Sequence, residues 1–409
     1  MYLIVIFLIL ITRIPQVAIE PPSTSLIMTR LFLDIDLVNR TEASMLYAHI
    51  TGIKLDAGGN SLGPMVMDTY GEPYMLQSPA LDGQALGVDH GIPIGKPGTK
   101  KRVRIPRLAG GRIYFSKNRK LTFLVNKGPA LVEPSTLNKS DPNYGGHWTF
   151  AEFTFNQNEV FANVSYVDFL SIPTALRLET DAGVVKQVKG IPKGGVTKVA
   201  KGLEKLGSPW NKLVVRSSSK SIIRILSMNS GYELYPELFG NYFNGYINEV
   251  WKHYETHKLY VDTQNGWGVF TGQVEDGLLR FIGRFKFYLE KPTTQDVLTC
   301  NTGPFAVKVA PPDEQEMARL AVGARVAAAF NRVTLLKNNR QPVGEKTSTY
   351  YGVQPCNYYS KKVHRVSHLH RGYTFPYDDV SPDEEHNLSG SVNDPNPKVL
   401  TVIVGGFRK

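Results

Sequence analysis

Two neighbouring segments rich in aromatic and β-branched residues constrain the fold of this chain more than any other feature. They span residues 149–155 and 160–170. Between them lie four polar residues, Asn156 to Glu159, with the composition of a turn. Aromatic and β-branched residues suit a pleated, half-buried surface, and two such runs joined by a short polar loop pair as antiparallel strands. The segment therefore predicts a β-hairpin.

Strand and turn signals dominate the chain from about Arg30 to Pro173, and the composition changes near Asp181. Helices are expected at residues 196–206, 236–255 and 313–332, the last opened by Asp313 as a helix start. Strand-like segments are expected between these helices at residues 258–262 and 278–289, and again near the end of the chain at 372–375 and 399–404. The middle of the chain is thus expected to be mixed α/β.

A chain of 409 residues can form one large core or two medium ones, so two lobes are expected. Strand character returns at the end of the chain, which indicates that the tail rejoins the first lobe. We therefore expect a β-rich α+β fold. Residues 28–180 and 371–409 would form a β-barrel or sandwich lobe, and residues 181–370 an inserted mixed α/β lobe.

Polar side chains follow one face of the first predicted strand of the hairpin. Because side chains alternate between the two faces of a strand, Glu152, Thr154 and Asn156 share one face. Phe153 and Phe155 then point into the core. A carboxyl, a hydroxyl and an amide in one row, supported by aromatic rings, can bind sugar hydroxyl groups and supply an acid.

The second strand of the hairpin supplies another acid, Asp168. With a turn centred near Asn158, Glu152 would lie opposite Ser165, and Asp168 would lie about 10 Å further along at ~3.3 Å per residue. Side chains that lean together would approach the separation of roughly 6.5–9.5 Å typical of inverting glycosidases, against about 5–5.5 Å in retaining ones. The spacing favours inversion, with Glu152 as general acid and Asp168 as general base. For Ser165 and Asp168 to line one cleft, the strand must bulge or bend between them.

This segment resembles the signature region of glycoside hydrolase family 64, the laminaripentaose-producing β-1,3-glucanases. In that family the catalytic acid is followed by Thr at +2, Asn at +4, Trp at +9, Thr at +13 and the catalytic Asp at +16. The matching positions here are Glu152, Thr154, Asn156, Phe161, Ser165 and Asp168. Phe161 keeps a stacking face but lacks the indole N–H of Trp, and Ser165 lacks the methyl group of Thr.

Other segments are also similar to this family: residues 37–40, 47–52, 111–116, 328–332 and 373–380. The resemblance implies a thaumatin-like β-barrel lobe and a mixed α/β lobe with a wide groove between them. It also implies hydrolysis of β-1,3-glucan to short oligosaccharides such as laminaripentaose, with substrate contacts from Thr154, Asn156, Phe161 and Ser165. We expect a monomer that needs no metal or other cofactor.

Two alternatives from other functional classes remain at this point. The net charge of +11 could favour nucleic acid, but the basic residues are scattered, without aromatic-interleaved or zinc-finger motifs, so a solvated basic face is favoured and no nucleic-acid partner is expected. The second alternative is a non-catalytic thaumatin-like β-glucan-binding protein. Such proteins are typically rich in disulfides, and this chain has 2 cysteines. A metal site is not favoured at its histidines: His364, His368 and His370 have no neighbouring carboxylate. His253 and His257 are one helical turn apart, but Glu255 is not placed as in the zinc-protease motif.

The chain begins with a run of ten apolar residues, Tyr2 to Ile11. This run is too short to span a bilayer, which takes about 20 residues, but suits the apolar core of a signal peptide. We therefore expect a signal peptide at residues 1–18, a secreted protein and no integral membrane association. Glycosylation sequons at Asn39, Asn138, Asn163 and Asn387 agree weakly with secretion. Cys300 and Cys356 could pair in an oxidising compartment or remain buried thiols.

Overall fold

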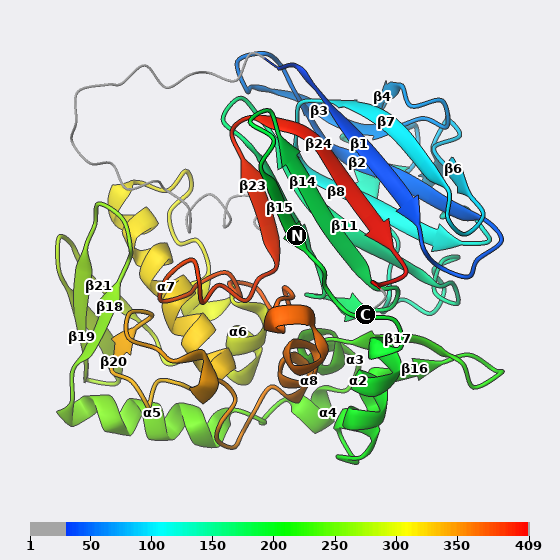
Figure 1. Ribbon diagram of the computed structural model, residues 1–409. Helices are drawn as coiled ribbons and strands as arrows, with labels where there is room; N and C mark the ends of the chain where they lie inside the picture. The colour runs from blue at the N-terminus through cyan, green and yellow to red at the C-terminus, as the bar shows by residue number, and fades with distance from the viewer. Residues whose placement is uncertain (1–29, 408–409) are drawn as a thin grey trace.

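The computed structural model describes residues 30–407, so the expected signal peptide at residues 1–18 lies outside the described residues. The described chain is rich in β-structure, with several sheets and a smaller number of helices. Most helices lie between residues 195 and 366, and strands fill the chain before and after them. In Figure 1 the strands of the first part of the chain, coloured blue to cyan, occupy the upper right, and most of the helices lie in the lower half.

The predicted hairpin lies in an eight-stranded sheet with the order β23-β12-β11-β8-β2-β3-β4, in which β6 also pairs with β2. Its strands are β2 Leu46–Leu55, β3 Ser61–Met67, β4 Pro73–Met75, β6 Ile92–Gly95, β8 Leu108–Lys117, β11 Trp148–Phe155, β12 Val160–Val164 and β23 Ser391–Asp394. Side chains on β11 alternate as expected, because Phe153 and Phe155 are buried whereas Glu152 and Thr154 are partly exposed. The hairpin prediction is confirmed, although its second strand ends at Val164 rather than Leu170.

The register of the hairpin differs from the expected one. Glu152 pairs with Asn163, not with Ser165. The Asn156 side-chain carbonyl accepts hydrogen bonds from the backbone N–H groups of Asn158 (2.8 Å) and Glu159 (3.0 Å), which closes a turn centred between Gln157 and Asn158. The partner of Glu152 is therefore two residues earlier than expected.

A second sheet has the order β15-β14-β24-β1-β7 and packs against the first. Its strands are β1 Phe32–Asn39, β7 Lys100–Pro106, β14 Thr174–Thr180, β15 Val185–Val188 and β24 Pro397–Val404. The C-terminal strand β24 lies between β14 and β1 and runs parallel to β1, so the expected return of the tail to the first strands is confirmed. The strand expected at residues 372–375 is wrong. Thr374 donates from its N–H and hydroxyl to Asp378, which closes a local turn, and Tyr373 makes only an isolated bridge with Ser165.

Three further sheets complete the β-structure. The first consists of β5 Gln84–Ala85, β9 Leu124–Asn126 and β10 Ala130–Val132, and the second of β13 Phe169–Leu170, β16 Val214–Arg216 and β17 Ile222–Leu226. The third, with five strands, consists of β18 Leu259–Asp262, β19 Val269–Glu275, β20 Leu278–Ile282, β21 Lys286–Leu289 and β22 Arg340–Gln341. The strands expected at residues 258–262 and 278–289 correspond to β18 and to the β20–β21 pair. Strand β13 matters most for the site, because it follows β12 in the chain but belongs to a different sheet.

The helices are α2 Gly195–Glu204, α3 Met228–Leu234, α4 Pro236–Phe239, α5 Asn244–Thr256, α6 Thr294–Thr299, α7 Glu314–Arg332 and α8 Tyr358–Val366. Helix α7 is confirmed, and the Asp313 side chain caps it by accepting from Glu316 N–H. The helix expected at 236–255 is instead two helices. The break follows Phe239, because the Phe243 N–H donates to Thr294 Oγ1 rather than continuing the helix.

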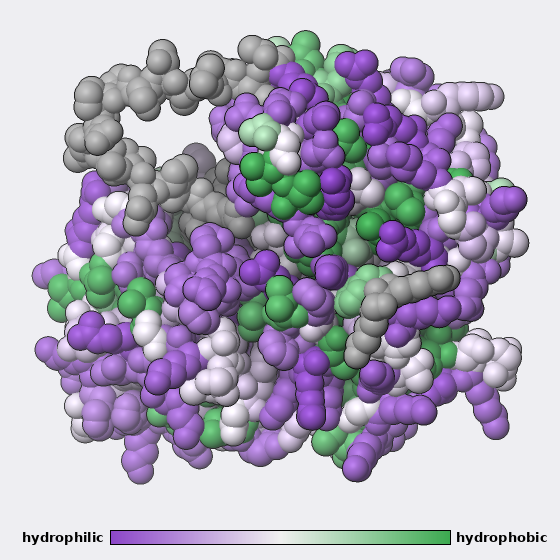
Figure 2. All heavy atoms as spheres, viewed as in Figure 1, coloured by the Kyte–Doolittle hydropathy of each residue, from purple (hydrophilic) through white to green (hydrophobic). Residues whose placement is uncertain are grey.

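Buried apolar side chains from both large sheets and from the helices form one continuous cluster. Cys300 and Cys356 lie buried as free thiols and are not joined by a disulfide. Figure 2 shows that hydrophilic residues cover most of the visible face, with hydrophobic residues scattered among them. Within residues 30–407 no helix has the length and apolar character needed to cross a bilayer.

Candidate active site

A row of polar residues crosses the eight-stranded sheet at the level of Glu152. Its members are consecutive cross-strand partners: Thr51 on β2, Arg112 on β8, Glu152 on β11, Asn163 on β12 and Ser391 on β23. Residues paired directly across strands point to the same face of a sheet, so their side chains form one line. The hairpin places Glu152 and Asn163 side by side. The strands on its two sides, β8 and β23, add Arg112 and Ser391 to the row.

The Glu152 carboxyl is held from both sides within this row. Arg112 Nη2 lies 3.3 Å from Oε1, and Asn163 Nδ2 donates to Oε2 at 3.3 Å. The relative solvent exposure of the Glu152 side chain is 13%, so the carboxyl is partly buried but still accessible to solvent. Asn163, one of the four sequons, is itself buried against Glu152, which leaves it poorly placed for a glycan.

Arg112 connects Glu152 to a second carboxyl, that of Glu133. Arg112 Nη1 donates to Glu133 Oε2 at 2.8 Å and to the Tyr114 hydroxyl at 3.2 Å. Its guanidinium also lies 4.8 Å from the centre of the Phe150 ring, a cation–π contact. The sequence provided no role for Arg112 or Glu133. The available signals are an arginine within a largely apolar strand and its position in the family-like segment 111–116. Only the register of β8 against β11 shows what Arg112 contacts.

Asp168 lies where the chain passes from the eight-stranded sheet to the sheet of β13 and β17. Its backbone carbonyl accepts hydrogen bonds from Ser227 N–H (3.0 Å) and Ser230 Oγ (2.8 Å), at the start of α3. These bonds fix the position of Asp168 against a helix rather than against its own hairpin. The change of sheet after Val164 also provides the bend that was expected between Ser165 and Asp168.

The Asp168 carboxyl makes no hydrogen bond or ion pair within residues 30–407, and it is partly exposed. Burial among protein atoms raises its pKa to about 6, with Arg112 acting in the opposite direction. The negative charges of Glu152, Glu133 and Glu233 raise this pKa further. Asp168 and Glu152 are therefore electrostatically coupled, although they come from different structural elements.

The four predicted substrate-binding residues lie in different settings. Thr154 and Phe161 are direct cross-strand partners on the same face as Glu152. Thr154 is partly exposed, and Phe161 keeps 8% of its exposure. The Asn156 side-chain oxygen is occupied by the turn, while Ser165 Oγ is buried and has no hydrogen-bond partner in the described chain. The structure thus brings Glu152, Thr154 and Phe161 together on one surface, and Asn156 and Ser165 lie at the ends of β11 and β12.

Two other polar features do not resemble a catalytic site. Asp378 is fully buried, and its carboxylate contacts Arg332 and His364 at 3.1 and 3.0 Å as part of the core.

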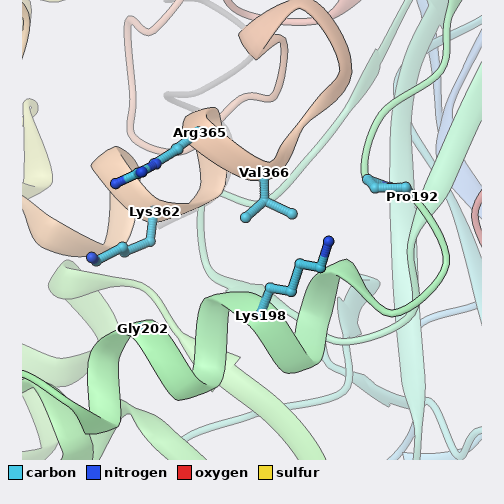
Figure 3. A pocket seen from close by; sticks show the side chains of 6 residues that line it. All are labelled: Pro192, Lys198, Gly202, Lys362, Arg365 and Val366. Carbon is cyan, nitrogen blue, oxygen red and sulfur yellow. The ribbon is translucent and has the colours of Figure 1, made fainter.

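A cavity of about 430 Å³ between α2 and α8 is lined by Pro192, Lys198, Gly202, Lys362, Arg365 and Val366. Figure 3 shows its basic side chains on the two helices. The lining includes no carboxyl group, so this cavity offers no acid–base pair. No group of three or more potential metal ligands occurs in the described part of the chain.

The site thus holds two partly buried carboxyl groups, one beside aromatic rings and an arginine and the other with a raised pKa. Glycoside hydrolases carry out acid–base chemistry with a pair of carboxyl groups. Residues 31–404 match the family model of the β-1,3-glucanases of glycoside hydrolase family 64, and the chain belongs to this family.

The relatives of known sequence include two proteins named glucan endo-1,3-beta-glucosidase, from Cellulosimicrobium cellulans and from Arthrobacter sp. (strain YCWD3). Each is 27% identical over 310 residues, which is 75% of this chain and 54% of the relative. The chain therefore spans about half the length of the curated relatives that it matches.

Solved structures resemble nearly the whole chain. A laminaripentaose-producing β-1,3-glucanase in complex with laminaritetraose has a TM-score of 0.79 and 26% identity, covering 91% of this chain and 98% of that one. A β-1,3-glucanase domain of the same family from Clostridium beijerinckii has a TM-score of 0.72 and 24% identity, covering 94% of this chain and 100% of that one, and so supports the fold alone.

Proposed function

We propose that the protein hydrolyses β-1,3-glucan by a single displacement, with Glu152 as general acid and Asp168 as general base. The observation that carries this proposal is the pair of electrostatically coupled, partly exposed carboxyl groups on β11 and before β13. Membership of the family supports the reaction, and the names of the relatives support the substrate.

In the proposed reaction Glu152 donates a proton to the glycosidic oxygen as the bond to the anomeric carbon breaks. Asp168 removes a proton from the water that attacks the same carbon from the opposite side. A carboxylate with a raised pKa is a stronger base than an ordinary aspartate once it is ionised, so partial burial of Asp168 favours this role. Because water rather than the Asp168 carboxylate attacks the anomeric carbon, no covalent intermediate forms and the anomeric configuration inverts.

The substrate contacts that we propose involve Thr154, Asn156, Phe161 and Ser165. Thr154 and Phe161 are supported by their position on the Glu152 face, where they offer a hydroxyl group and a ring for stacking. For Asn156, only the side-chain NH₂ would be available, because its oxygen closes the turn. For Ser165, a partnerless hydroxyl can pair with the substrate only if the segment around it opens.

We also propose that the glucan lies in a wide groove between two lobes. Residues 28–180 and 371–409 would form a thaumatin-like β-barrel lobe, and residues 181–370 an inserted lobe. The return of β24 to β1 and the position of Asp168, where the chain enters the sheet of β13 and β17, support this division. The solved relative in complex with laminaritetraose supports a site of this kind.

The other proposed properties are secretion, a monomeric state and release of short oligosaccharides such as laminaripentaose. The resemblance to a laminaripentaose-producing enzyme supports the product, and the apolar run at Tyr2 to Ile11 supports secretion.

Digestion of a linear β-1,3-glucan tests the proposed function. We expect release of reducing ends, short products on sizing, and α-anomers as the first products in proton NMR, because the glucan bonds are β and the displacement inverts. A β-1,4-glucan of similar length serves as the control substrate. First products in the β-configuration would contradict the mechanism, and glucan binding without any release of reducing ends would favour the non-catalytic alternative.

The pH dependence of kcat/KM provides a separate prediction. Asp168 must be ionised to act as a base, and its pKa is raised to about 6 by burial. As the pH falls through 6, Asp168 takes up a proton and kcat/KM should decrease by about tenfold per pH unit. Initial rates on soluble glucan, measured across the acidic and neutral range, check this. An acid limb near pH 4, the value of an ordinary aspartate, would contradict the assigned environment of Asp168.

A further inference from the structure

The contact between Arg112 and Glu152 raises a question about the proposed mechanism. A guanidinium next to a carboxyl group favours the ionised form of that group. Yet a general acid must hold its proton until the glycosidic bond breaks. Arg112 Nη2 lies 3.3 Å from Glu152 Oε1, and both side chains are mostly buried, so solvent screens this interaction only partly. Something else in the site must offset the charge of Arg112.

Glu133 is the group placed to offset this charge. It directly follows β10, so it reaches the site from a segment outside the eight-stranded sheet. Its Oε2 lies 2.8 Å from Arg112 Nη1, closer than the 3.3 Å between Arg112 and Glu152. The relative solvent exposure of the side chain is 18% for Glu133 and 12% for Arg112, so the pair is largely shielded from water. The shorter contact makes Glu133 the stronger partner of Arg112.

We propose that Glu133 is a positioning residue that draws the charge of Arg112 away from Glu152, so that Arg112 orients the Glu152 carboxyl without opposing its role as proton donor. This inference rests on the proposed roles of Glu152 and Asp168. Arg112 would then have two functions: to fix the Glu152 side chain within the row, and to balance the carboxyl groups of the site. Glu133 touches no reacting atom in this scheme: it acts on Glu152 through Arg112 and on Asp168 through its charge.

The charge of Asp168 also acts on Arg112, but Glu133 makes the shorter of the two ion pairs that Arg112 forms with Glu133 and Glu152. The titratable groups that face Asp168 or Arg112 from the surrounding elements are Tyr114 on β8, Glu152 on β11, Glu233 on α3, Tyr359 on α8 and Glu133 itself. Tyr373 also lies near Glu152. Burial raises the pKa of each of Tyr114, Tyr359 and Tyr373, so these phenols stay neutral. Glu233 acts on Asp168, but within residues 30–407 it makes no ion pair with Arg112.

The proposal makes opposite predictions for two neutral substitutions. In Glu133→Gln the full charge of Arg112 acts on Glu152, and one negative charge near Asp168 is lost. Both the alkaline and the acid limbs of the kcat/KM profile should therefore move to lower pH, by about half a unit or more. In Arg112→Gln the positive charge is lost, and both limbs should move to higher pH. A residue that only supports the local structure would lower activity without moving the limbs in opposite directions.

The experiment compares kcat/KM on soluble β-1,3-glucan across pH for the wild-type chain, Glu133→Gln, Arg112→Gln and Glu133→Asp. The matched control is Glu133→Asp, which keeps the negative charge and should leave the limbs near their wild-type positions. Circular dichroism confirms that each variant is folded. Limbs that stay in place in Glu133→Gln, or that move in the same direction in both neutral variants, would overturn the proposal.

Failure of this inference can be separated from failure of the proposed function. A wild-type chain that releases no reducing ends at any pH contradicts the function itself. A wild-type chain with a bell-shaped profile that Glu133→Gln does not move contradicts only the role of Glu133. Should Glu133→Gln fail to fold, the double variant Arg112→Gln/Glu133→Gln decides. An alkaline limb at the position found for Arg112→Gln supports the proposal, and an alkaline limb at clearly lower pH refutes it.

Discussion

Glu152→Gln and Asp168→Asn are each expected to lower kcat on soluble β-1,3-glucan by about 10²–10⁴-fold, the usual contribution of a positioned acid or base. Both substitutions keep the size of the side chain, so the fold should remain intact. In Glu152→Gln the amide cannot supply the proton that the leaving oxygen needs. In Asp168→Asn the amide cannot accept the proton of the attacking water. Initial rates of reducing-end release, with circular dichroism of each variant, measure the effect.

A matched control for this pair exists on the same hairpin. Glu159 ends the turn before β12, is partly exposed and accepts a hydrogen bond from Asn393 Nδ2 at 3.0 Å. Glu159→Gln should keep nearly all of the activity, because Glu159 lies outside the row that holds Glu152. Near-wild-type rates in Glu152→Gln or Asp168→Asn would remove that residue from its proposed role.

A substrate with an activated leaving group separates the two roles. An aryl glycoside whose leaving group needs no protonation should partly rescue Glu152→Gln, since that variant lacks only the acid. It should not rescue Asp168→Asn, which lacks the base that activates water. Equal rescue of both variants would contradict the assignment of acid to Glu152 and base to Asp168.

The second large effect is expected in the core rather than in the site. Asp378→Ala should lower the free energy of unfolding by about 3–5 kcal/mol, the usual cost of removing one partner of a buried ion pair. Asp378 is completely buried, and its carboxylate accepts hydrogen bonds from Arg332 Nη2 (3.1 Å) and from Thr374 N–H (3.0 Å) and Oγ1 (2.8 Å). His364 Nε2 lies 3.0 Å from the same carboxylate. Without Asp378 the buried Arg332 guanidinium loses its counter-charge.

Urea unfolding of the wild-type chain and of Asp378→Ala measures this loss. The matched control is Asp383→Ala, which removes an exposed aspartate paired with His386 and should leave the urea midpoint nearly unchanged. A loss below about 1 kcal/mol in Asp378→Ala would mean that the carboxylate does not balance Arg332, because exposed substitutions cost about that little.

Local patterns were sufficient for much of the fold. The alternation of Phe153 and Phe155 with Glu152 and Thr154 identifies a strand and its two faces, because side chains on a strand alternate strictly. The cap at Asp313 and the Ala-rich segment after it identify α7, because both are properties of neighbouring residues. The final strand could be predicted in the same way, and its position between β1 and β14 agrees with the prediction that the tail returns.

Errors arose where a specific hydrogen bond, from a distant residue or from a nearby side chain, competed with the pattern of the segment. Residues 236–255 have a helical pattern, but Thr294 accepts the Phe243 N–H and the helix breaks. Residues 372–375 have the composition of a strand, but hydrogen bonds to Asp378 turn the backbone. The register of the hairpin was wrong by two residues, because the Asn156 side chain fixes the turn. In each case a specific hydrogen bond outweighed a weak propensity.

The sequence by itself therefore identifies the two proposed catalytic residues. They are Glu152 on the polar face of a strand and Asp168 sixteen positions later, in a family-like spacing. Tertiary structure alone decides their surroundings. Arg112 lies 40 residues before Glu152 and meets it only through the register of β8 with β11, and Glu133 reaches Arg112 from another sheet. The physical reason is that alternation depends on neighbouring residues, whereas register and burial depend on the packing of distant strands. The charge around the two carboxyl groups, and hence the raised pKa of Asp168, follows from that packing.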